Sequence, residues 1–489
     1  MTSPNRSPRI AVAALLAQAL ATLSCLPAFD RPVLGDDNQT VSLRYVGSAT
    51  CSAVGCHGGA GLKHPKGSEY SIWAQQDAHS RAFSRLREES SRRMAERLGT
   101  TSAHEAKQCL SCHSTTVTPR SGVLSTEGVN CESCHGPAEK WLTLHVRKDW
   151  AAVSPDQRTE LGFHDTQRLL SRAKLCADCH VGSHANGRGV NHDLIAAGHP
   201  RLRFELNSYL ANMPAHWDRD TDRSRLVVAG SDNFAAAETQ VWALGQLVAA
   251  SRTARLIALR DDGHDDPSPV PIDFSHVDCH ACHHQLQAPN WRQEFRWPGQ
   301  RLGTPSVGTW YFGLLEFIEV VEPDGLRRSP VLELKPLRRP SLGPPDTGPF
   351  DCTSKVWKIA ATNFDRWGTD VARRDWTRAD VLRLMNGLAV EGAQLSARTW
   401  ESTSQLYLAM VAVTSDLREN RDQLDENSRR AAEATDEALE LIRQRLEFPG
   451  QPVPLDSPRD FDTARVKAIH ELFAHIRQAW SHTTVERKR

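Results

Sequence analysis

Five short motifs, each made of two cysteines followed directly by a histidine, constrain this 489-residue chain more than any other feature. Four of them place two residues between the cysteines and read CLSCH, CESCH, CADCH and CHACH, whereas the first reads CSAVGCH and places four. Because ten of the twelve cysteines are grouped in this way, one kind of chemical site is repeated along the chain. In chain order, motifs 1 to 5 consist of Cys51, Cys56 and His57; Cys109, Cys112 and His113; Cys131, Cys134 and His135; Cys176, Cys179 and His180; and Cys279, Cys282 and His283.

The C-x-x-C-H pattern is the attachment signature of c-type haem. The two thiols bond to the two vinyl groups of the ring, and the adjacent histidine takes one axial position on the iron. A zinc site gives no reason for a histidine after every pair, and a thioredoxin-like redox pair would occur once, beside a β-α-β pattern. Disulfides do not require a following histidine either. The sequence therefore predicts covalently attached haem c, five copies in all and at least four.

Motif 1 is the one that leaves an alternative open, because its longer spacer also suits a small disulfide loop. The inserted Gly55 permits a turn there, so the extra residues can bulge outward while both thiols reach the ring. Since four similar motifs follow, we expect Cys51 and Cys56 to attach a haem and His57 to bind its iron.

Sixteen of the 21 histidines lie outside the motifs and can supply second axial ligands. An iron with two histidine ligands is saturated and suited to electron transfer, whereas an open position lets small molecules bind and react. Motifs 2 and 5, with His113 and His283, have the least evident partner. The candidate second ligands are His79, His145, His164, His192 and His199, and His216 and His284 rank behind them.

The N-terminus has the form of a secretory signal. Arg6 and Arg9 precede an apolar run over residues 10–23, and an A-x-A site ends at Ala21. The run is short for a membrane helix, and no other stretch approaches that length. We therefore expect a periplasmic or otherwise exported protein with no transmembrane segment beyond the signal.

Charge and composition narrow the class of protein further. Lys plus Arg and Asp plus Glu both total 59, and this balance argues against a nucleic-acid-binding protein, which would show a basic excess. The hydrophobic fraction of 39% and the mean hydropathy of −0.47 indicate a lean apolar core. Buried haem rings would supply apolar surface that side chains otherwise provide.

At several of these motifs the chain resembles the multihaem cytochromes of the cytochrome c-554 type. The resemblance covers roughly residues 45–180 and is strongest in YVGSATC…GCH, in the tryptophan and HSRA of residues 73–82, in EGVNCESCHGPAEKW over 127–141, and in FH…CADCH over 163–180. It implies a mostly helical scaffold, closely packed haem pairs, irons with two histidines and a role in passing electrons. It also implies that His79 and His145 are second ligands. The fifth motif, the long first spacer and the C-terminal extension depart from the family, so the family's partner, hydroxylamine oxidoreductase, is not carried over.

The expected fold class is mainly α with little β: a haem-packed cytochrome scaffold followed by a C-terminal helical bundle. Apolar residues recur at helical spacing in the last part of the chain, for example Leu406, Met410, Val413 and Leu417. Thr377 and Asp380 have the form of a capping box. The expected organisation is a signal peptide over 1–21, a flexible leader over 22–44, a multihaem domain over 45–300, a proline-rich linker or wrapping segment over 301–350 and a helical domain over 351–489.

The leading hypothesis is an exported pentahaem cytochrome that moves electrons between redox partner proteins, with no catalytic residue. The rival is an oxidoreductase acting on a small nitrogen or sulfur compound at one five-coordinate haem. A third interpretation gives the C-terminal helices the task of docking the cytochrome onto a membrane complex.

Overall fold

The computed structural model describes residues 43–60, 66–115, 125–219, 222, 231–260, 273–277, 279, 283, 308, 310–319, 354–396, 400–446 and 463–483. The chain divides into Met1–Leu43 and Arg44–Arg489, and the helices of the described residues all lie in the second part. The expected signal peptide, nearly all of the leader and most of the proline-rich segment lie outside the described residues, as do Cys282 and His284. The domain boundaries expected from the sequence therefore stay a prediction.

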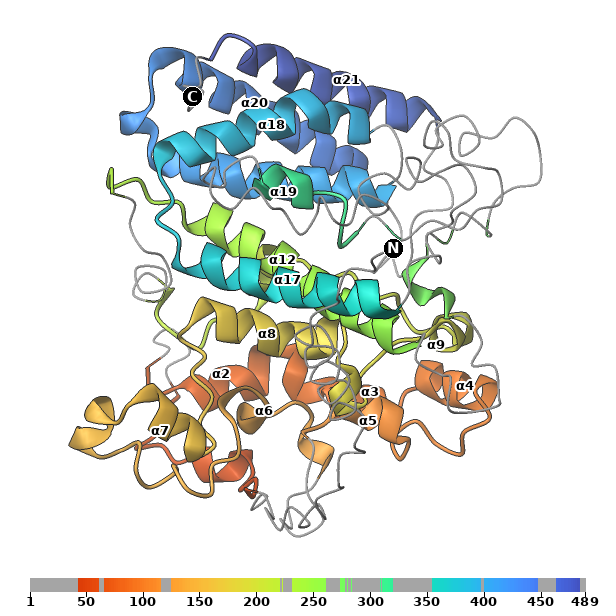
Figure 1. The fold of residues 1–489 in the computed structure, drawn as a ribbon. Coiled ribbons are helices and arrows are strands. Elements are labelled where there is room, and N and C mark those ends of the chain that lie inside the picture. The colour runs from red at the N-terminus through yellow and green to blue at the C-terminus, as the bar shows by residue number, and fades with distance from the viewer. Residues whose placement is uncertain are drawn as a thin grey trace, which may run out of the picture. The chain divides into compact units, whose positions relative to one another are not determined.

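The first half of the described chain is built from short helices, and the expected mainly helical fold is confirmed (Figure 1). Three of the helices end at a motif histidine. In these helices the two cysteines of a pair are three residues apart, about one helical turn, and therefore lie on one face. No strand occurs in the described ranges, apart from an isolated bridge between Ser183 and Arg188. The α-helices of this half are α2 (Glu69–Gln76), α3 (Ala82–Arg85), α4 (Glu89–Arg97), α5 (Lys107–His113), α6 (Cys131–His135), α7 (Pro155–Glu160), α8 (Leu169–His180), α9 (His192–Ala197) and α10 (Leu206–Asn212).

Helix α12 (Ala237–Arg260) lies at the centre of the molecule's packing. It packs against α8 on one side and against α17 (Ser354–Arg373) and α19 (Trp400–Glu419) on another (Figure 1). Its residues Trp242, Leu244 and Leu247 are completely buried. The first turn is capped from α19, since Asp416 accepts hydrogen bonds from the main-chain N–H groups of residues 238 and 239 at 3.1 and 2.7 Å.

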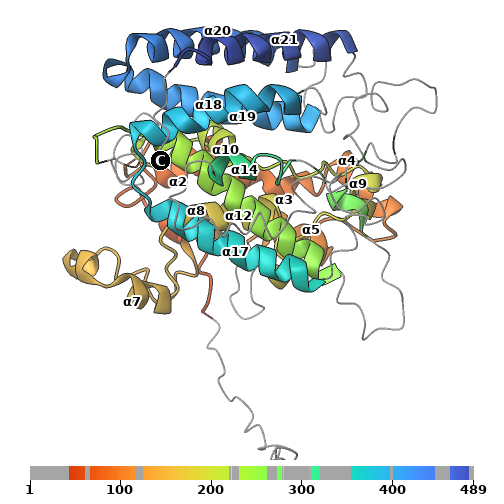
Figure 2. The ribbon, with the colours of Figure 1, turned by 45° about the horizontal axis from the view of Figure 1, so that its top comes forward.

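The C-terminal helices form the expected bundle (Figure 2). It consists of α18 (Arg378–Ser396), α19, α20 (Glu426–Leu446) and α21 (Thr463–Trp480), which follow one another in antiparallel contact and close through α18 and α21. The stripe Leu406, Met410, Val413 and Leu417 is wholly buried, as the spacing predicts. The capping box at the start of α18 is also confirmed: the Thr377 N–H donates to the Asp380 carboxylate at 3.1 Å, and the Asp380 N–H donates to the Thr377 hydroxyl at 3.3 Å.

Buried apolar side chains are distributed unevenly along the chain. One continuous core runs from α8 through α12 to the C-terminal helices, whereas the region before α6 has a small separate cluster of Phe83, Leu86, Ala95 and Ala103. The part of the chain that carries motifs 1 to 3 is thus the part with the least hydrocarbon core of its own. No described helix is long and apolar enough to cross a membrane.

Candidate haem-binding site

Each motif histidine lies opposite a second histidine ring, and this pairing defines the site. The distances between ring centroids fall in a narrow range, from 6.0 to 6.4 Å. The five pairs are His57 with His145 at 6.3 Å, His113 with His199 at 6.4 Å, His135 with His216 at 6.4 Å, His180 with His79 at 6.0 Å, and His283 with His192 at 6.3 Å.

The separation of the paired rings fits a single metal ion between them. An imidazole nitrogen binds a metal at about 2 Å, so two rings facing one iron have centroids about 6 Å apart. Within the described ranges no group of three or more His, Cys, Asp or Glu could hold a bare metal ion. Histidines that meet in pairs, next to paired thiols, therefore fit haem iron, whose ring supplies the other four ligands.

Hydrogen bonds fix the orientation of several of these rings. The Nδ1 atoms of His57 and His79 lie 2.9 Å from the carboxylates of Glu69 and Asp77. Those of His113 and His199 lie 3.1 and 2.8 Å from the carbonyl oxygens of residues 82 and 200. A ring whose Nδ1–H is held in this way presents Nε2 to a metal, which is the usual arrangement around a ligating histidine.

Four of the five predicted second ligands lie opposite a motif histidine: His79, His145, His192 and His199. His164 does not. Its main-chain N–H donates to the carbonyl of His135 at 3.0 Å, while the ring that faces His135 is that of His216. The two histidines are more than fifty residues apart in the chain, so spacing alone could not choose between them.

Motif 1 forms an outward turn. The Cys56 and Gly58 N–H groups both donate to the Ala53 carbonyl, at 2.8 and 3.0 Å. Val54 is 80% exposed, and a Cβ atom placed on Gly55 would meet nothing within 4 Å. The extra residues of this spacer therefore project from the surface. Cys51 and Cys56 form no disulfide in the structure, so the alternative of a disulfide loop is not found here.

Glu132, between the cysteines of motif 3, is a supporting residue that the sequence did not single out. Its buried carboxylate accepts from the N–H groups of Val46 and Gly47 at 2.9 and 2.8 Å and from that of Ala138 at 2.8 Å. It therefore fastens the segment before motif 1 to motif 3. The sequence did contain a signal for this residue: a charged side chain inside C-E-S-C-H has to lie in the same buried turn as the two cysteines.

The motifs are close to one another as well as to their histidines. The thiols of Cys51 and Cys131 lie close enough to shift one another's pKa, and so do those of Cys112 and Cys179. These contacts bring motif 1 beside motif 3 and motif 2 beside motif 4.

Electrostatics favour neutral rings at the most deeply placed motif histidines. Burial lowers the pKa of His135 to about 4, and the neighbouring His216 and His57 add to the shift. Burial likewise lowers the pKa of His180 to about 4, with His79 and His113 contributing. Neutral imidazole is the form that binds a metal.

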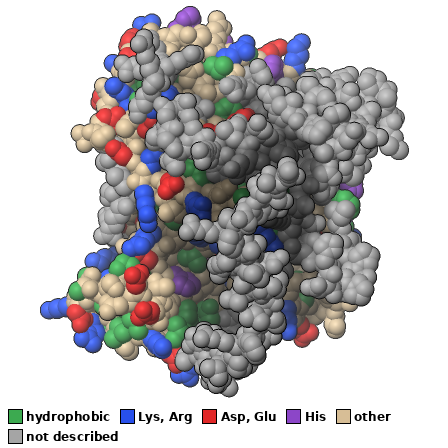
Figure 3. Space-filling model, viewed as in Figure 1, with side chains coloured by type: hydrophobic (Ala, Val, Ile, Leu, Met, Phe, Trp, Pro, Cys, Tyr) green, Lys and Arg blue, Asp and Glu red, His purple; other side chains and the backbone are tan. Residues whose placement is uncertain are grey.

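The surface over the N-terminal region is partly apolar. Hydrophobic side chains and a histidine gather on the lower part of the face shown in Figure 3, over the region of the short helices. Val54 in the turn of motif 1 is 80% exposed, and Val146, directly after His145, is 70% exposed.

The helical scaffold, the paired thiols and the paired histidines together are the features expected of a c-type cytochrome. Comparison with known families agrees: residues 50–136 match the family described as cytochrome c554 and c-prime. This segment belongs to that family, and the resemblance predicted from the sequence is confirmed there. For this segment the match supports a c-type cytochrome of electron transfer with covalently bound haem c. No match was found among curated proteins or solved structures.

Proposed function

We propose that the protein is an exported pentahaem cytochrome that passes electrons between redox partner proteins. The observation that carries the proposal is the set of five histidine pairs, each with ring centroids 6.0 to 6.4 Å apart and each containing one motif histidine. Bound haem supplies one-electron chemistry, and iron held by two histidines exchanges electrons without binding substrate. In this proposal His216 replaces His164 as the second ligand of motif 3.

The contacts between motifs support a continuous row in the order 1, 3, 4, 2, 5. The closeness of Cys51 to Cys131 and of Cys112 to Cys179 joins motif 1 to motif 3 and motif 2 to motif 4. Burial raises the pKa of Cys134 in motif 3 to about 11 and the charge of Cys179 in motif 4 adds to the shift, so motifs 3 and 4 lie near one another. His192, which begins the short helix α9, faces the histidine of motif 5, and His199, just past the cap of that helix, faces the histidine of motif 2. Motif 5 therefore extends the row beyond motif 2.

The two ends of the row are its most accessible parts. At motif 1 the His57 side chain is 40% exposed and Cys56 is exposed; at motif 5 His283 is exposed. Partner proteins would exchange electrons there, because the rate of transfer falls steeply with distance and the ends offer the shortest approach. The middle motifs, 3, 4 and 2, serve as relays.

The enzyme hypothesis needs one iron with an open position. Motifs 2 and 5 were the places where the sequence left room for it, and both motif histidines face a second ring, His199 and His192. This geometry favours the relay over the reductase or oxidase.

The decisive experiment combines a count of haem with a count of spin states. We expect five haems per chain from the absorbance of the pyridine complex, only low-spin iron by electron paramagnetic resonance, and a reduced spectrum that carbon monoxide leaves unchanged. A high-spin signal together with turnover of nitrite, hydroxylamine or tetrathionate would instead establish the enzyme.

Motif 1 can be tested separately. Replacing Cys51 and Cys56 by alanine should lower the mass of covalently attached haem from five copies to four. A wild-type count of four that the double variant does not change would show that this motif carries no haem.

Export is tested by fractionation. With the predicted signal over 1–21 intact, the mature protein should be recovered outside the cytoplasm and begin after the A-x-A site. Retention of apoprotein in the cytoplasm would contradict this part of the proposal.

A further inference from the structure

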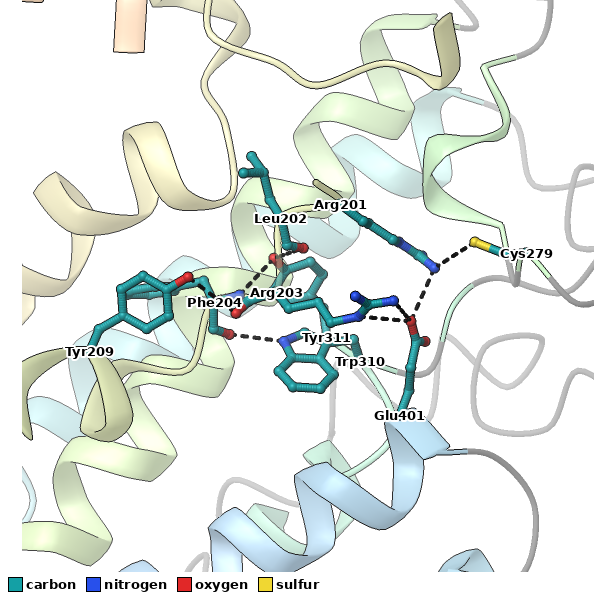
Figure 4. A network of polar contacts seen from close by, with 9 residues as sticks. All are labelled: Arg201, Leu202, Arg203, Phe204, Tyr209, Cys279, Trp310, Tyr311 and Glu401. Atoms are coloured by element: carbon teal, nitrogen blue, oxygen red, sulfur yellow. Dashed lines mark hydrogen bonds and ion pairs between the residues drawn. The ribbon is translucent and has the colours of Figure 1, made fainter. Parts of the chain in front are cut away.

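A buried network of ion pairs joins the C-terminal bundle to motif 5 (Figure 4). Glu401, in the first turn of α19, accepts a hydrogen bond from Arg201 Nη1 at 3.1 Å and contacts Arg203 at 3.5 Å. The three side chains are only 7 to 11% exposed. Buried charges are screened little by solvent ions, so their positions influence neighbouring groups strongly.

Arg201 stands between the carboxylate and the sulfur of motif 5. The same Nη1 atom that contacts Glu401 lies 3.3 Å from the Sγ atom of Cys279 (Figure 4). The positive end of the ion pair therefore faces the attachment sulfur. Arginine keeps its charge at every pH at which the protein is folded, so this is a permanent feature of the site.

The backbone that carries Arg201 is held at several points. The hydroxyl of Tyr311 donates to the Leu202 carbonyl at 2.8 Å, and the Trp310 indole N–H donates to the Phe204 carbonyl at 3.0 Å. Trp310 in turn stacks on Trp400, with ring centroids 6.1 Å apart. Trp400 also lies beneath the guanidinium of Arg203, which is 5.3 Å from the centre of its ring.

Aromatic residues also connect this network to motif 4. The ring of Phe204 stacks on His180 at 5.9 Å, and Tyr209 lies edge-on to His180 at 4.7 Å. The segment 201–204 thus runs from the histidine of a central motif to the cysteine of the terminal one, with α19 supporting it. Through this segment the C-terminal bundle is therefore in contact with motifs 4 and 5.

We propose that Glu401 positions Arg201 against the attachment sulfur of motif 5, where its charge raises the reduction potential of the haem that His283 and His192 hold. The inference rests on the proposed function for the presence of that haem. A fixed positive charge destabilises ferric iron more than ferrous iron by Coulomb repulsion, and charge and hydrogen bonding near the sulfur tune haem potentials. The C-terminal bundle thereby makes the haem of motif 5 a better electron acceptor than it would be without this charge.

The test is a spectroelectrochemical titration of the full-length protein that resolves the midpoint potentials. In Arg201→Met we expect one of the five midpoints to move to a lower potential while the other four stay in place. Arg201→Lys, which keeps the charge, should retain most of the wild-type value. Glu401→Asp keeps the total charge but draws the guanidinium away from the sulfur, so it should also lower that one midpoint.

A matched control is Arg374→Met. Arg374 is likewise buried, paired with a carboxylate at 3.0 Å and stacked on a tryptophan, but it pairs with Asp380 within the bundle and not with a motif cysteine. It should move no midpoint. Midpoints that shift equally in both variants would show a general loss of packing and overturn the proposal.

The haem concerned is identified in a background with Cys279 and Cys282 replaced by alanine. If the proposal is right, Arg201→Met moves none of the remaining midpoints there, and a shift that persists would assign the effect to another haem. The mass of attached haem separates the proposed function from the inference about Arg201. If the Cys279 and Cys282 background has lost no haem, the proposed function is contradicted. If it has lost one haem but Arg201→Met shifts no midpoint in the otherwise wild-type protein, only the inference about Arg201 is contradicted. If Arg201→Met does not fold, Arg201→Lys and Glu401→Asp still decide between these outcomes.

Discussion

At the scale of single residues, His164 and His216 are the two candidates for the proposed second ligand of motif 3. His164 and His216 both lie close to His135, but His216 presents its ring at 6.4 Å whereas His164 contacts the His135 carbonyl through its main-chain N–H. A ligand must direct a nitrogen lone pair at the metal, so nearness of the backbone is not enough. The choice between two plausible histidines is thus made by the direction of a ring.

The paired variants His216→Gly and His164→Gly test this choice. Loss of a true axial ligand leaves an iron with five ligands, which becomes high-spin and binds small molecules. We therefore expect His216→Gly to add one high-spin signal in electron paramagnetic resonance, reversed by added imidazole, while His164→Gly adds none. The reverse pattern would restore His164 as the ligand.

At the scale of elements, two glycines in helices illustrate different packing demands. A Cβ atom on Gly245 of α12 would lie 2.6 Å from the Cβ of Leu206, a completely buried residue of α10. A Cβ atom on Gly368 of α17 would lie 3.5 Å from Leu244 and 3.8 Å from Leu247, which is ordinary contact. Helix α10 can approach α12 this closely only because position 245 has no side chain.

Alanine at the two positions should therefore have opposite effects. Gly→Ala within a helix favours folding by up to about 1 kcal/mol, so Gly368→Ala should be neutral or stabilising. Gly245→Ala forces two elements apart and should lower the free energy of unfolding by about 1–3 kcal/mol. Thermal unfolding followed by circular dichroism measures both. Equal midpoints would show that α10 moves aside freely.

The cap of α18 gives a dependence on pH. Burial of Asp380 raises the pKa of its carboxyl, but Arg374, the Thr377 hydrogen bonds and Arg383 outweigh this, and the pKa lies below its ordinary value of 3.8. The unfolded chain then binds the proton more tightly, so stability rises with pH through this range. The contribution is complete above pH 3.8 and is lost as pH falls through the lower, folded pKa.

Asp380→Asn should remove this contribution and leave two arginines without their carboxylate. We expect a loss of about 3 kcal/mol near neutral pH, and a difference from wild type that shrinks on acidification below about pH 4. Melting temperatures measured from pH 3 to 7 provide the check. Glu433→Gln, which removes an exposed partner of Arg421, is the control and should cost less than about 1 kcal/mol at any pH. A constant difference across the range would contradict the assignment.

For the whole molecule, α12 is shared between the haem motifs and the C-terminal helices. Its apolar residues belong to the same core as those of α8, which carries motif 4, and of α19 in the bundle. Leu247 is completely buried and faces Gly368 of α17. The residues on either side of the proline-rich segment therefore depend on one another for packing.

Because the haem-motif region and the C-terminal helices share this core, we expect them to unfold together, and coincident transitions by two probes are the test. Loss of the low-spin haem spectrum and loss of helical circular dichroism should share a single thermal midpoint. Leu247→Ala should move both by the same amount and cost about 2–5 kcal/mol, while Leu441→Ala, at a position 42% exposed on α20, should move neither appreciably. Two separate transitions would show that the bundle is an independent domain, as expected if its sole task were docking to a membrane complex.

The sequence by itself determined the local chemistry. A cysteine pair with its adjacent histidine is a short-range pattern, so the five motifs, the family of residues 50–136 and the amphipathic stripe of α19 could all be recognised without coordinates. His79 and His145 were predicted as second ligands by resemblance, and His192 and His199 by their spacing, and the structure places all four rings opposite a motif histidine. These features depend on residues that are close together in the chain.

Tertiary structure alone decided what depends on contacts between distant residues. It brought His216 to His135 and His192 to His283, and it set Arg201 between Glu401 and Cys279, across 200 residues of chain. These contacts result from the packing of α9, α12 and α19, and no spacing of residues along the chain predicts them. The physical reason is that ligation and charge placement require directions and distances in space, which only the packed fold defines.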